Sequence, residues 1–240
     1  MLKRTLSLTE QAKAHIKQLI LDDVFVDGRI HSETDLAADL GVSRTTIRDA
    51  LSRLEIEGVI YRKQGAGTFI NPAGLQIKSR LDEIWSYEDM IDAHDYIPST
   101  KILSVNVQSA PEDLAAELDL QPEEPLLVVR KLFLADRQPV ILAYNYIPTA
   151  LITQSYTEAD FMHPVFEFLW ANGQRLAYYL SEIVPLLTTG ELAETLHVRP
   201  GLPLVSFAEI GYNDDNIPII KSTSCFRDDF LRLRLIRRKP

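Results

Sequence analysis

Two arginines and two threonines stand together near the start of the stretch GVSRTTIRDALSRLEIEG, residues 41–58: Arg44, Thr45, Thr46 and Arg48. On a helix, the apolar residues of the same stretch fall on the opposite face: Ile47, Ala50, Leu51 and Leu54. Arginine's planar guanidinium can bond O6 and N7 of guanine together, and threonine can reach a phosphate or a thymine methyl group. This spacing predicts a helix that packs by one side and reads the DNA major groove with the other.

The flanking sequence supplies the elements that would position this helix. Residues 7–24 have the apolar period of a helix, and Ser32 can cap a second helix that Gly41 ends. Ser43 can cap the third helix, whose free N–H groups favour a phosphate, and we count it among the DNA contacts.

The run VIYRKQGAGTFINP that follows predicts a hairpin with a glycine-rich tip. Three helices and a hairpin predict a winged helix-turn-helix. The hairpin residues expected near the minor groove are Lys63, Gln64, Gly65 and Gly67. The alternative is a small helical subdomain whose charged face is only solvated.

The run SETDLAADLGVSRTTIRDALSRLEIEGVIYRKQGAGTFI resembles the DNA-binding domain of GntR-family transcriptional regulators over about residues 7–71. The resemblance implies base or phosphate contacts from Arg44, Thr45, Thr46 and Arg48, with the hairpin tip near the minor groove. Two residues depart from the family pattern. His31 and Thr34 stand where the family usually has proline and a DNA-reading arginine. We therefore expect Thr34 to be a weaker contact and the operator to differ from the common one.

The charge distribution divides the chain into two parts. Residues 1–72 carry ten basic and ten acidic residues, so the net charge of −9 lies entirely in the remainder. The run NPAGLQIKSR has no clear period and predicts a linker. We expect a DNA-binding domain over 1–71, a linker over 72–84, and a second domain over 85–240.

The same composition restricts the class of protein. No apolar run reaches the ~20 residues of a membrane span, and the N-terminus has no signal-peptide pattern. Cys225 is the only cysteine, which favours a reducing cytoplasm, and five scattered histidines offer no paired metal spacing. We expect a cytoplasmic protein without a metal or another cofactor.

The second domain contains an internal repeat. The segment LAAELDLQPEEPLLVVRKLFLADRQPVI begins at Leu114, and LAETLHVRPGLPLVSFAEIGYNDDNIPII begins at Leu192. Each copy reads as a short helix, a proline-bounded strand, a polar turn and a second strand, and a strand-like run precedes each copy. The repeat predicts two hairpins related by a pseudo-twofold axis in one antiparallel sheet. Helices such as the one expected over residues 163–173 would cover this sheet.

The segments RKLFLADRQPVILAYNYIP and RPGLPLVSFAEIGYNDDNIPIIKSTSCFRDDF resemble the two hallmark segments of the UTRA effector domain of the HutC subfamily, over about residues 85–236. That domain shares the chorismate lyase fold. The resemblance implies an α+β architecture, a small-molecule pocket between sheet and helices, a homodimer, and repression that the ligand relieves.

The resemblance also suggests pocket residues. In many members that bind sugar phosphates, the first hairpin carries two arginines and a glutamate, and the second carries a glutamate and an aromatic residue. In this sequence those five positions hold Lys131, Phe133, Ala143, Ile220 and Phe226. With a shift of one residue in the alignment, Arg130 becomes relevant. Further candidates are Tyr96, Tyr144 and His163, which precedes a proline at an expected helix start.

These substitutions predict a more apolar pocket. A phenylalanine cannot bind phosphate as a bidentate arginine does, whereas Lys131 offers a point charge suited to one carboxylate. We expect an anionic or neutral effector with substantial apolar surface. The alternative is that Phe133, Ala143 and Ile220 are core residues and another face binds the ligand.

The sequence thus predicts a ligand-responsive repressor that binds a palindromic DNA operator as a homodimer. One alternative is an enzyme of the chorismate lyase type with an accessory DNA-binding domain, although no nucleophile–base pair stands out. Another is a GntR regulator with an all-helical effector domain, which the strand repeat disfavours. The basic C-terminal run RLRLIRRK alternates like a final strand with its arginines facing water.

Overall fold

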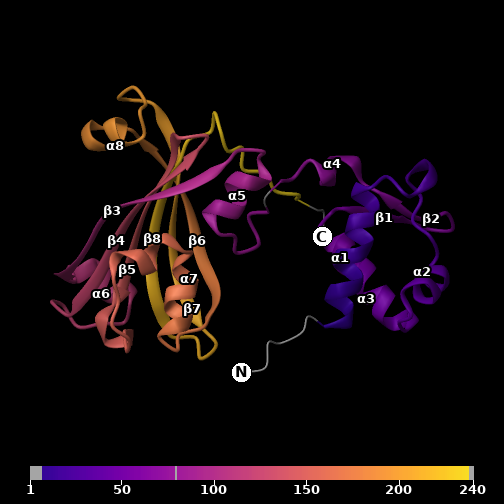
Figure 1. Cartoon of the computed structure of the whole chain (residues 1–240), viewed down its shortest axis with the longest axis horizontal. Helices are drawn as coiled ribbons and strands as arrows, with labels where there is room; N and C mark the ends of the chain where they lie inside the picture. The colour runs from indigo at the N-terminus through magenta and orange to yellow at the C-terminus, as the bar shows by residue number, and fades with distance from the viewer. Residues whose placement is uncertain (1–6, 79, 238–240) are drawn as a thin grey trace. The chain divides into compact units, whose positions relative to one another are not determined.

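The computed structural model describes residues 7–78 and 80–237, which divide into two compact units (Figure 1). The first unit contains the described residues up to Lys78 together with those from Arg234 onward, and the second ends at Leu233. Within the described residues, none of the helices is both long and apolar enough to span a bilayer.

The first unit is a helical domain with a two-stranded hairpin. Its helices are α1 (Leu8–Leu21), the 3₁₀ turn η1 (Val26–Gly28), α2 (Glu33–Leu40), α3 (Arg44–Ile56) and α4 (Pro72–Leu75). Strands β1 (Ile60–Lys63) and β2 (Gly67–Ile70) pair antiparallel. A serine side chain caps each of α1, α2 and α3 by accepting a hydrogen bond from the backbone N–H three residues later: Ser7, Ser32 and Ser43. Gly41 ends α2 at φ 64°, a left-handed conformation that glycine adopts without strain.

Helix α4 packs on this first unit. A Cβ atom on Gly74 would lie 1.9 Å from the carbonyl oxygen of Gly58, so only glycine permits this approach. Leu75 packs against the hydrophobic core that α1, α2 and α3 share. The segment directly after the hairpin is therefore helical and docked, although its sequence has no clear period.

The second unit is built on one six-stranded antiparallel sheet in the order β3-β4-β5-β8-β7-β6. The strands are β3 (Pro98–Ser109), β4 (Pro125–Ala135), β5 (Gln138–Pro148), β6 (Leu176–Leu187), β7 (Pro203–Asn213) and β8 (Pro218–Phe226). The helices are α5 (Tyr87–Ala93), α6 (Glu112–Glu117), η2 (Thr149–Leu151), η3 (Glu158–Met162), α7 (Val165–Ala171) and α8 (Gly190–Thr195).

The sheet confirms the internal repeat. The elements β6, α8 and β7 begin and end 78 residues after β3, α6 and β4, respectively. The hairpins β4–β5 and β7–β8 meet at the β5·β8 pair, which places a pseudo-twofold axis at the centre of the sheet. The all-helical alternative is therefore wrong for this chain.

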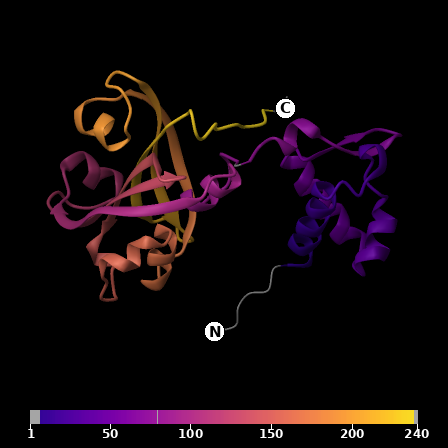
Figure 2. The ribbon, with the colours of Figure 1, turned by 45° about the horizontal axis from the view of Figure 1, so that its top comes forward.

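Each face of the sheet has its own layer of helices (Figures 1 and 2). On one face, Phe133 packs with residues of α5, while Leu127 and Val129 pack with residues of η3 and α7. On the other face, α6 packs on Leu126 and α8 packs on Leu132. Because successive residues of a strand point to opposite faces, neighbouring residues of β4 belong to different cores.

The C-terminal segment differs from its prediction. Arg227 anchors it, with its Nη1 donating to the carbonyls of Pro139 (3.1 Å) and Leu196 (3.2 Å). Leu231 is buried and Leu233 packs beside it, but the described residues 227–237 contain no strand, only one isolated bridge at Arg234. The predicted final strand is wrong, because the described part of this run pairs at one residue only and its leucines pass from buried Leu231 to Leu235, which is 58% exposed.

Candidate functional site

Helix α3 separates its two faces as its sequence requires. Ile47, Ala50 and Leu54 are fully buried against α1 and α2. Arg44, Thr45 and Arg48 are exposed on the other side. The exposed side therefore presents guanidinium and hydroxyl groups at the N-terminal end of a 13-residue helix.

Ser43 fixes the start of this helix. Its Oγ accepts a hydrogen bond from the backbone N–H of Thr46 at 3.1 Å and lies 2.8 Å from Oγ1 of Thr46. Thr46 is half-buried. The Thr46 hydroxyl thus takes part in the cap, which leaves Thr45 as the more exposed of the two threonines.

Arg48 is oriented by helix α2. Its Nε and Nη2 both donate to Oε2 of Glu33 at 3.2 Å, while the Arg48 side chain stays 55% exposed. Glu33 was absent from the sequence-based candidates. The neighbouring Thr34 is exposed at the start of α2, and its side chain forms no hydrogen bond within the described residues.

The hairpin tip contains two glycines with positive φ angles. Gln64, Gly65 and Ala66 connect the two strands, and Gly65 (φ 72°) and Gly67 (φ 118°) take conformations that favour glycine. Lys63, Gln64 and Gly65 are exposed. Arg29 lies against the hairpin, since its Nε is 3.3 Å from the position of a Cβ on Gly67. The sequence analysis did not single out this arginine.

The second unit contains a cavity of about 600 Å³ on the sheet face that α5 and α7 cover. Its floor is formed by residues of β4, β5, β6, β7 and β8, and the start of α7 closes one side. The remaining wall is the continuous segment Arg80–Glu88. Nine consecutive residues near the start of the second unit therefore form one wall of the cavity.

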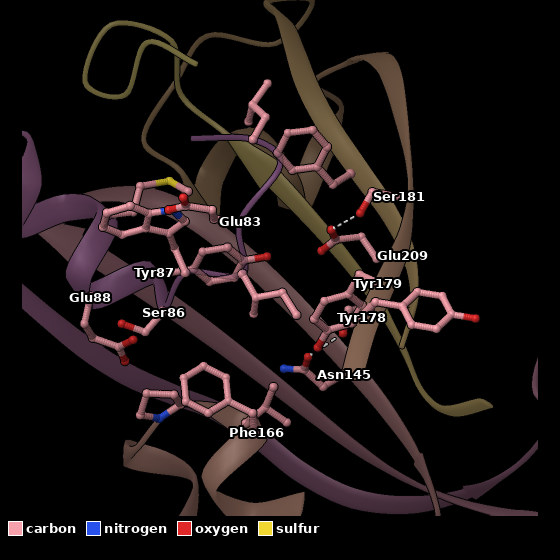
Figure 3. A pocket seen from close by; sticks show the side chains of 18 of the residues that line it. Glu83, Ser86, Tyr87, Glu88, Asn145, Phe166, Tyr178, Tyr179, Ser181 and Glu209 are labelled. Atoms are coloured by element: carbon pink, nitrogen blue, oxygen red, sulfur yellow. Dashed lines mark hydrogen bonds between the residues drawn. The ribbon is translucent and has the colours of Figure 1, made fainter. Parts of the chain in front are cut away.

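Aromatic side chains dominate this lining. Tyr87 packs edge-on against Phe133 and Phe226, with ring centroids 5.0 and 5.6 Å apart. Burial raises the pKa of the Tyr87 and Tyr179 hydroxyls, so both remain protonated donors. The indole Nε1 of Trp85 is buried without a hydrogen-bond partner in the described structure. The cavity thus combines apolar walls with hydrogen-bond donors (Figure 3).

Lys131 is the cation at the β4 side of the cavity. The residue is only 2% exposed, and its Nζ donates to the carbonyl oxygen of His163 at 2.8 Å. Nζ also lies 5.0 Å from the ring centroid of Phe133. Burial lowers the pKa of Lys131, and Glu88 and Glu167 partly oppose this effect. Within the described residues no carboxylate forms an ion pair with it.

Glu209 is the carboxylate at the β7 side. It accepts a hydrogen bond from the hydroxyl of Ser181 on β6. Figure 3 shows Tyr87 and Glu209 on opposite sides of the same space. Burial raises the pKa of Glu209, and the Ser181 hydrogen bond opposes this rise. No described cation is ion-paired with Glu209.

Comparisons with known proteins match both units. Residues 8–70 match the bacterial regulatory proteins of the gntR family, and residues 93–232 match the UTRA domain. The chain belongs to the GntR family of regulators with a UTRA domain. It is therefore a DNA-binding transcriptional regulator with an effector domain, as the sequence predicted.

Several relatives align over most of this chain. The HTH-type transcriptional repressor NagR of Bacillus subtilis (strain 168) is 25% identical over 223 residues, which cover 92% of this chain and 89% of NagR. The histidine utilization repressor of Pseudomonas putida is 28% identical over 193 residues, 78% of this chain and 72% of the repressor. The crystal structure of the possible transcriptional regulator YydK from Bacillus subtilis subsp. subtilis str. 168 aligns with a TM-score of 0.76. Its sequence identity is 19%, and the alignment covers 98% of this chain and all of YydK.

In this GntR-family regulator, only part of the expected effector set lies in the cavity. Lys131, Phe133 and Phe226 line it. Ala143 and Ile220 are buried core residues on the same sheet face, in keeping with the alternative reading of those positions.

Arg130 and Tyr144 lie on the opposite face of the sheet, which corrects their place among the candidates. The Arg130 guanidinium carbon lies 5.3 Å from the Tyr144 ring centroid, and Arg130 forms an ion pair with Glu191 of α8. The alternation of β4 forces this outcome, since Lys131 points into the cavity and its neighbour must point away.

Tyr96 and His163 do not line the cavity either. Tyr96 packs against Phe230, with ring centroids 5.4 Å apart. His163 contributes its backbone carbonyl to Lys131, and the seven-residue helix α7 starts after Pro164. The expected anion site at this helix start is therefore not supported, because the adjacent carbonyl faces the lysine.

The cavity lining also includes residues that were not predicted from the sequence: Trp85, Tyr87, Asn145, Tyr179, Ser181 and Glu209. A signal existed for one of them. Glu209 lies 78 residues after Lys131, at the equivalent position of the second repeat. Comparing the two copies residue by residue would have found it.

Proposed function

We propose that this protein is a cytoplasmic repressor that binds a two-fold-symmetric operator as a homodimer and leaves it when a small molecule fills the cavity. The observation that carries the proposal is the cavity wall Arg80–Glu88, which lies near the start of the second unit and follows the first unit closely in the chain. A ligand in the cavity contacts this connecting segment itself.

The DNA contacts we propose are those of α3 and the hairpin tip. Arg44 and Arg48 would read base edges in the major groove, Ser43, Thr45 and Thr46 would contact phosphates or bases, and Thr34 would add a weaker contact. The tip residues Lys63, Gln64, Gly65 and Gly67 would approach the minor groove. The exposure of Arg44, Thr45 and Arg48 supports this assignment.

Strand β6 supports the homodimer. It is an edge strand of 12 residues, and its side chains Leu180 (59%), Ile183 (59%) and Leu187 (63%) are exposed. A long apolar edge strand pairs readily with another chain, and proteins usually cover such an edge. A second copy of this strand is the partner that a symmetric operator requires.

The cavity supports effector binding. Its volume of about 600 Å³ lies within the range of small-molecule sites, and it holds convergent polar groups among aromatic walls. Lys131 is the group we propose for an anionic part of the effector, with Phe133 and Phe226 forming apolar contacts. We propose no enzymatic activity for this chain, so each ligand should be recovered chemically unchanged.

Selection of operator DNA tests the first half of this proposal. The purified protein would enrich sites from a random duplex pool, and footprinting would map them at a fixed salt concentration. We expect two inverted half-sites whose centres lie about 34 Å apart, one helical turn, or a multiple of this distance. A single asymmetric site bound by a monomer would contradict it.

A thermal-shift screen tests the second half. The panel would contain sugar phosphates, free sugars, amino-acid catabolites, and aromatic and aliphatic acids. A ligand at 100 times its dissociation constant adds about 2.7 kcal/mol of stability to the folded state. We expect at least one compound to raise the melting temperature and to release the selected DNA. A ligand that stabilises the protein without changing its DNA affinity, or that is converted to product, would overturn the proposal.

A further inference from the structure

The two ends of the cavity carry opposite charges at equivalent positions. Lys131 lies on β4 and Glu209 lies on β7, 78 residues later in the repeat. Both side chains line the cavity. The pseudo-twofold axis of the sheet therefore relates a cation to an anion, with Asn145 and Ser222 on the two strands between them.

The protein compensates these two charges only in part. Within the described residues, Glu88, which also lines the cavity, and Glu167 favour the charged form of Lys131 without pairing with it, and Glu209 is half-buried. Lys131 donates to one backbone carbonyl, and Glu209 accepts from one serine hydroxyl. Within the described residues neither of the two forms an ion pair. A charge held away from bulk water is costly unless an opposite charge or several hydrogen bonds compensate it. A bound molecule with complementary groups would supply that compensation.

Within the described residues the two charged groups do not pair with each other, and they lie on strands that are not neighbours. In the order β4-β5-β8-β7, their strands are separated by three inter-strand spacings, roughly 14 Å at 4.7–4.9 Å each. A small ligand whose positive and negative groups lie close together would contact either Lys131 or Glu209, but not both. A molecule that engages both must be elongated, with its own charges separated by an apolar body.

The cavity wall beside Lys131 suits the apolar part of such a molecule. Tyr87 packs edge to face on Phe133 and Phe226 there. Between the charged ends, the Ser222 hydroxyl donates to Oδ1 of Asn145 at 2.8 Å, so these polar groups satisfy one another. The unpartnered Nε1 of Trp85 adds one donor in the connecting wall.

We propose that the effector is an elongated zwitterion that places its anionic group at Lys131 and an ammonium or comparable cationic donor at Glu209, with an aromatic or aliphatic spacer between. This inference rests on the proposed function of the cavity. It replaces the expectation of a purely anionic or neutral effector with a molecule that carries both charges.

Three probes of matched shape test this proposal on the full-length protein. 4-(Aminomethyl)phenylacetate carries both charges, 4-methylphenylacetate only the anion, and 4-methylbenzylamine only the cation. We expect calorimetry to show that the first binds about tenfold or more tightly than either of the others, because each end forms a charge-assisted hydrogen bond. Equal affinity of the first two probes would overturn the role of Glu209.

Substitutions at Glu209 and Lys131 test which charged group of the probe each residue binds. In Glu209→Gln, the zwitterionic probe should fall to the affinity of 4-methylphenylacetate, whose own affinity should not change. In Lys131→Met, it should fall to that of 4-methylbenzylamine. Glu191→Gln is the matched control, since Glu191 pairs with Arg130 on the opposite sheet face. A Glu209→Gln variant that weakens the first two probes equally would contradict the proposal, and the wild-type comparison decides if a variant fails to fold.

The thermal-shift panel distinguishes failure of this inference from failure of the proposed effector function. Binding of a sugar phosphate or a simple monoacid, but none of the zwitterionic probe, would overturn this inference and leave the effector function intact. Absence of binding by every compound, including the probes, would count against both.

Discussion

The two units of this regulator place their functional side chains in opposite ways. In the first unit, all the proposed DNA contacts except Thr34 lie within two short segments, 43–48 and 63–67, and most of them are exposed. In the second unit, the cavity draws on five strands, the helices α5 and α7 and the segment before α5, and its lysine is only 2% exposed.

This contrast follows from the partner that each region meets. The DNA duplex is large and enters no cavity, so a helix must carry its contacts on an outer face. A small molecule is bound by being surrounded, which requires side chains from distant segments. Variants in the first unit should therefore change DNA binding alone, whereas changes in the cavity should act on ligand binding.

The largest expected effect is on operator affinity. The double variant Arg44→Ala/Arg48→Ala should weaken binding to the selected operator about 100-fold or more, because each bidentate contact contributes about 1–3 kcal/mol. Gel-shift titration at fixed salt measures this loss. The ligand-induced thermal shift should stay as in the wild type. A reduced shift would contradict the view that DNA binding and ligand binding depend on separate sets of residues.

A second prediction concerns the fold that supports the DNA-reading surface. Gly74→Ala should destabilise the first unit by about 1–3 kcal/mol, since its Cβ would meet the Gly58 carbonyl oxygen at 1.9 Å. Chemical denaturation monitored by circular dichroism measures the change. Gly65→Ala is the control for a glycine with no neighbour within 4 Å, where only backbone strain applies. Equal losses in both variants would show that α4 does not need this close approach.

The pH dependence of ligand binding sharpens the description of the cavity. Burial raises the pKa of Glu209 and lowers the pKa of Lys131. As pH falls through the raised pKa, Glu209 loses the charge that holds a cation, and as pH rises through the lowered pKa, Lys131 loses the charge that holds an anion. The affinity for 4-(aminomethyl)phenylacetate should therefore peak over a narrower pH range than ordinary glutamate and lysine would give.

Calorimetry across pH measures this profile. Glu88 and Glu167 also act on Lys131, and they favour its charged form. Glu209→Gln should remove the acid-side loss beyond that of the probe's own carboxylate and leave the alkaline side unchanged. An alkaline side that moves in this variant would mean that the two ends do not act independently.

The smallest expected effect is that of the cap on α3. Ser43→Ala removes the acceptor of the Thr46 N–H and should cost about 1 kcal/mol of stability. Ser7→Ala is a matched control, because Ser7 caps α1 in the same way away from the proposed DNA contacts. The Ser43 variant should lose more operator affinity than the Ser7 variant, measured by the same gel-shift titration. Equal affinities would show that Ser43 supports the helix without contacting DNA.

Features that depend on residues close together in the chain could be predicted from the sequence alone. Serine at a cap, glycine at a turn and the apolar period of α3 act within a few residues, so the helices, the hairpin and the exposed arginines could be predicted. The repeat also predicted the paired hairpins, since two copies of one pattern give two copies of one structure. The alternation of the C-terminal run was less informative, because the described part of that run pairs at one residue only.

The face of the sheet that each strand side chain occupies, and the distant residues that it meets there, depend on the tertiary structure. A shift of one residue moves a strand side chain to the other face, so Lys131 faces the cavity and Arg130 faces α8. The meeting of Lys131 with Glu209 depends on the pairing of four strands, and the aromatic wall depends on where the connecting segment docks. These contacts join residues far apart in the chain, and no local pattern specifies which distant partners share a cavity.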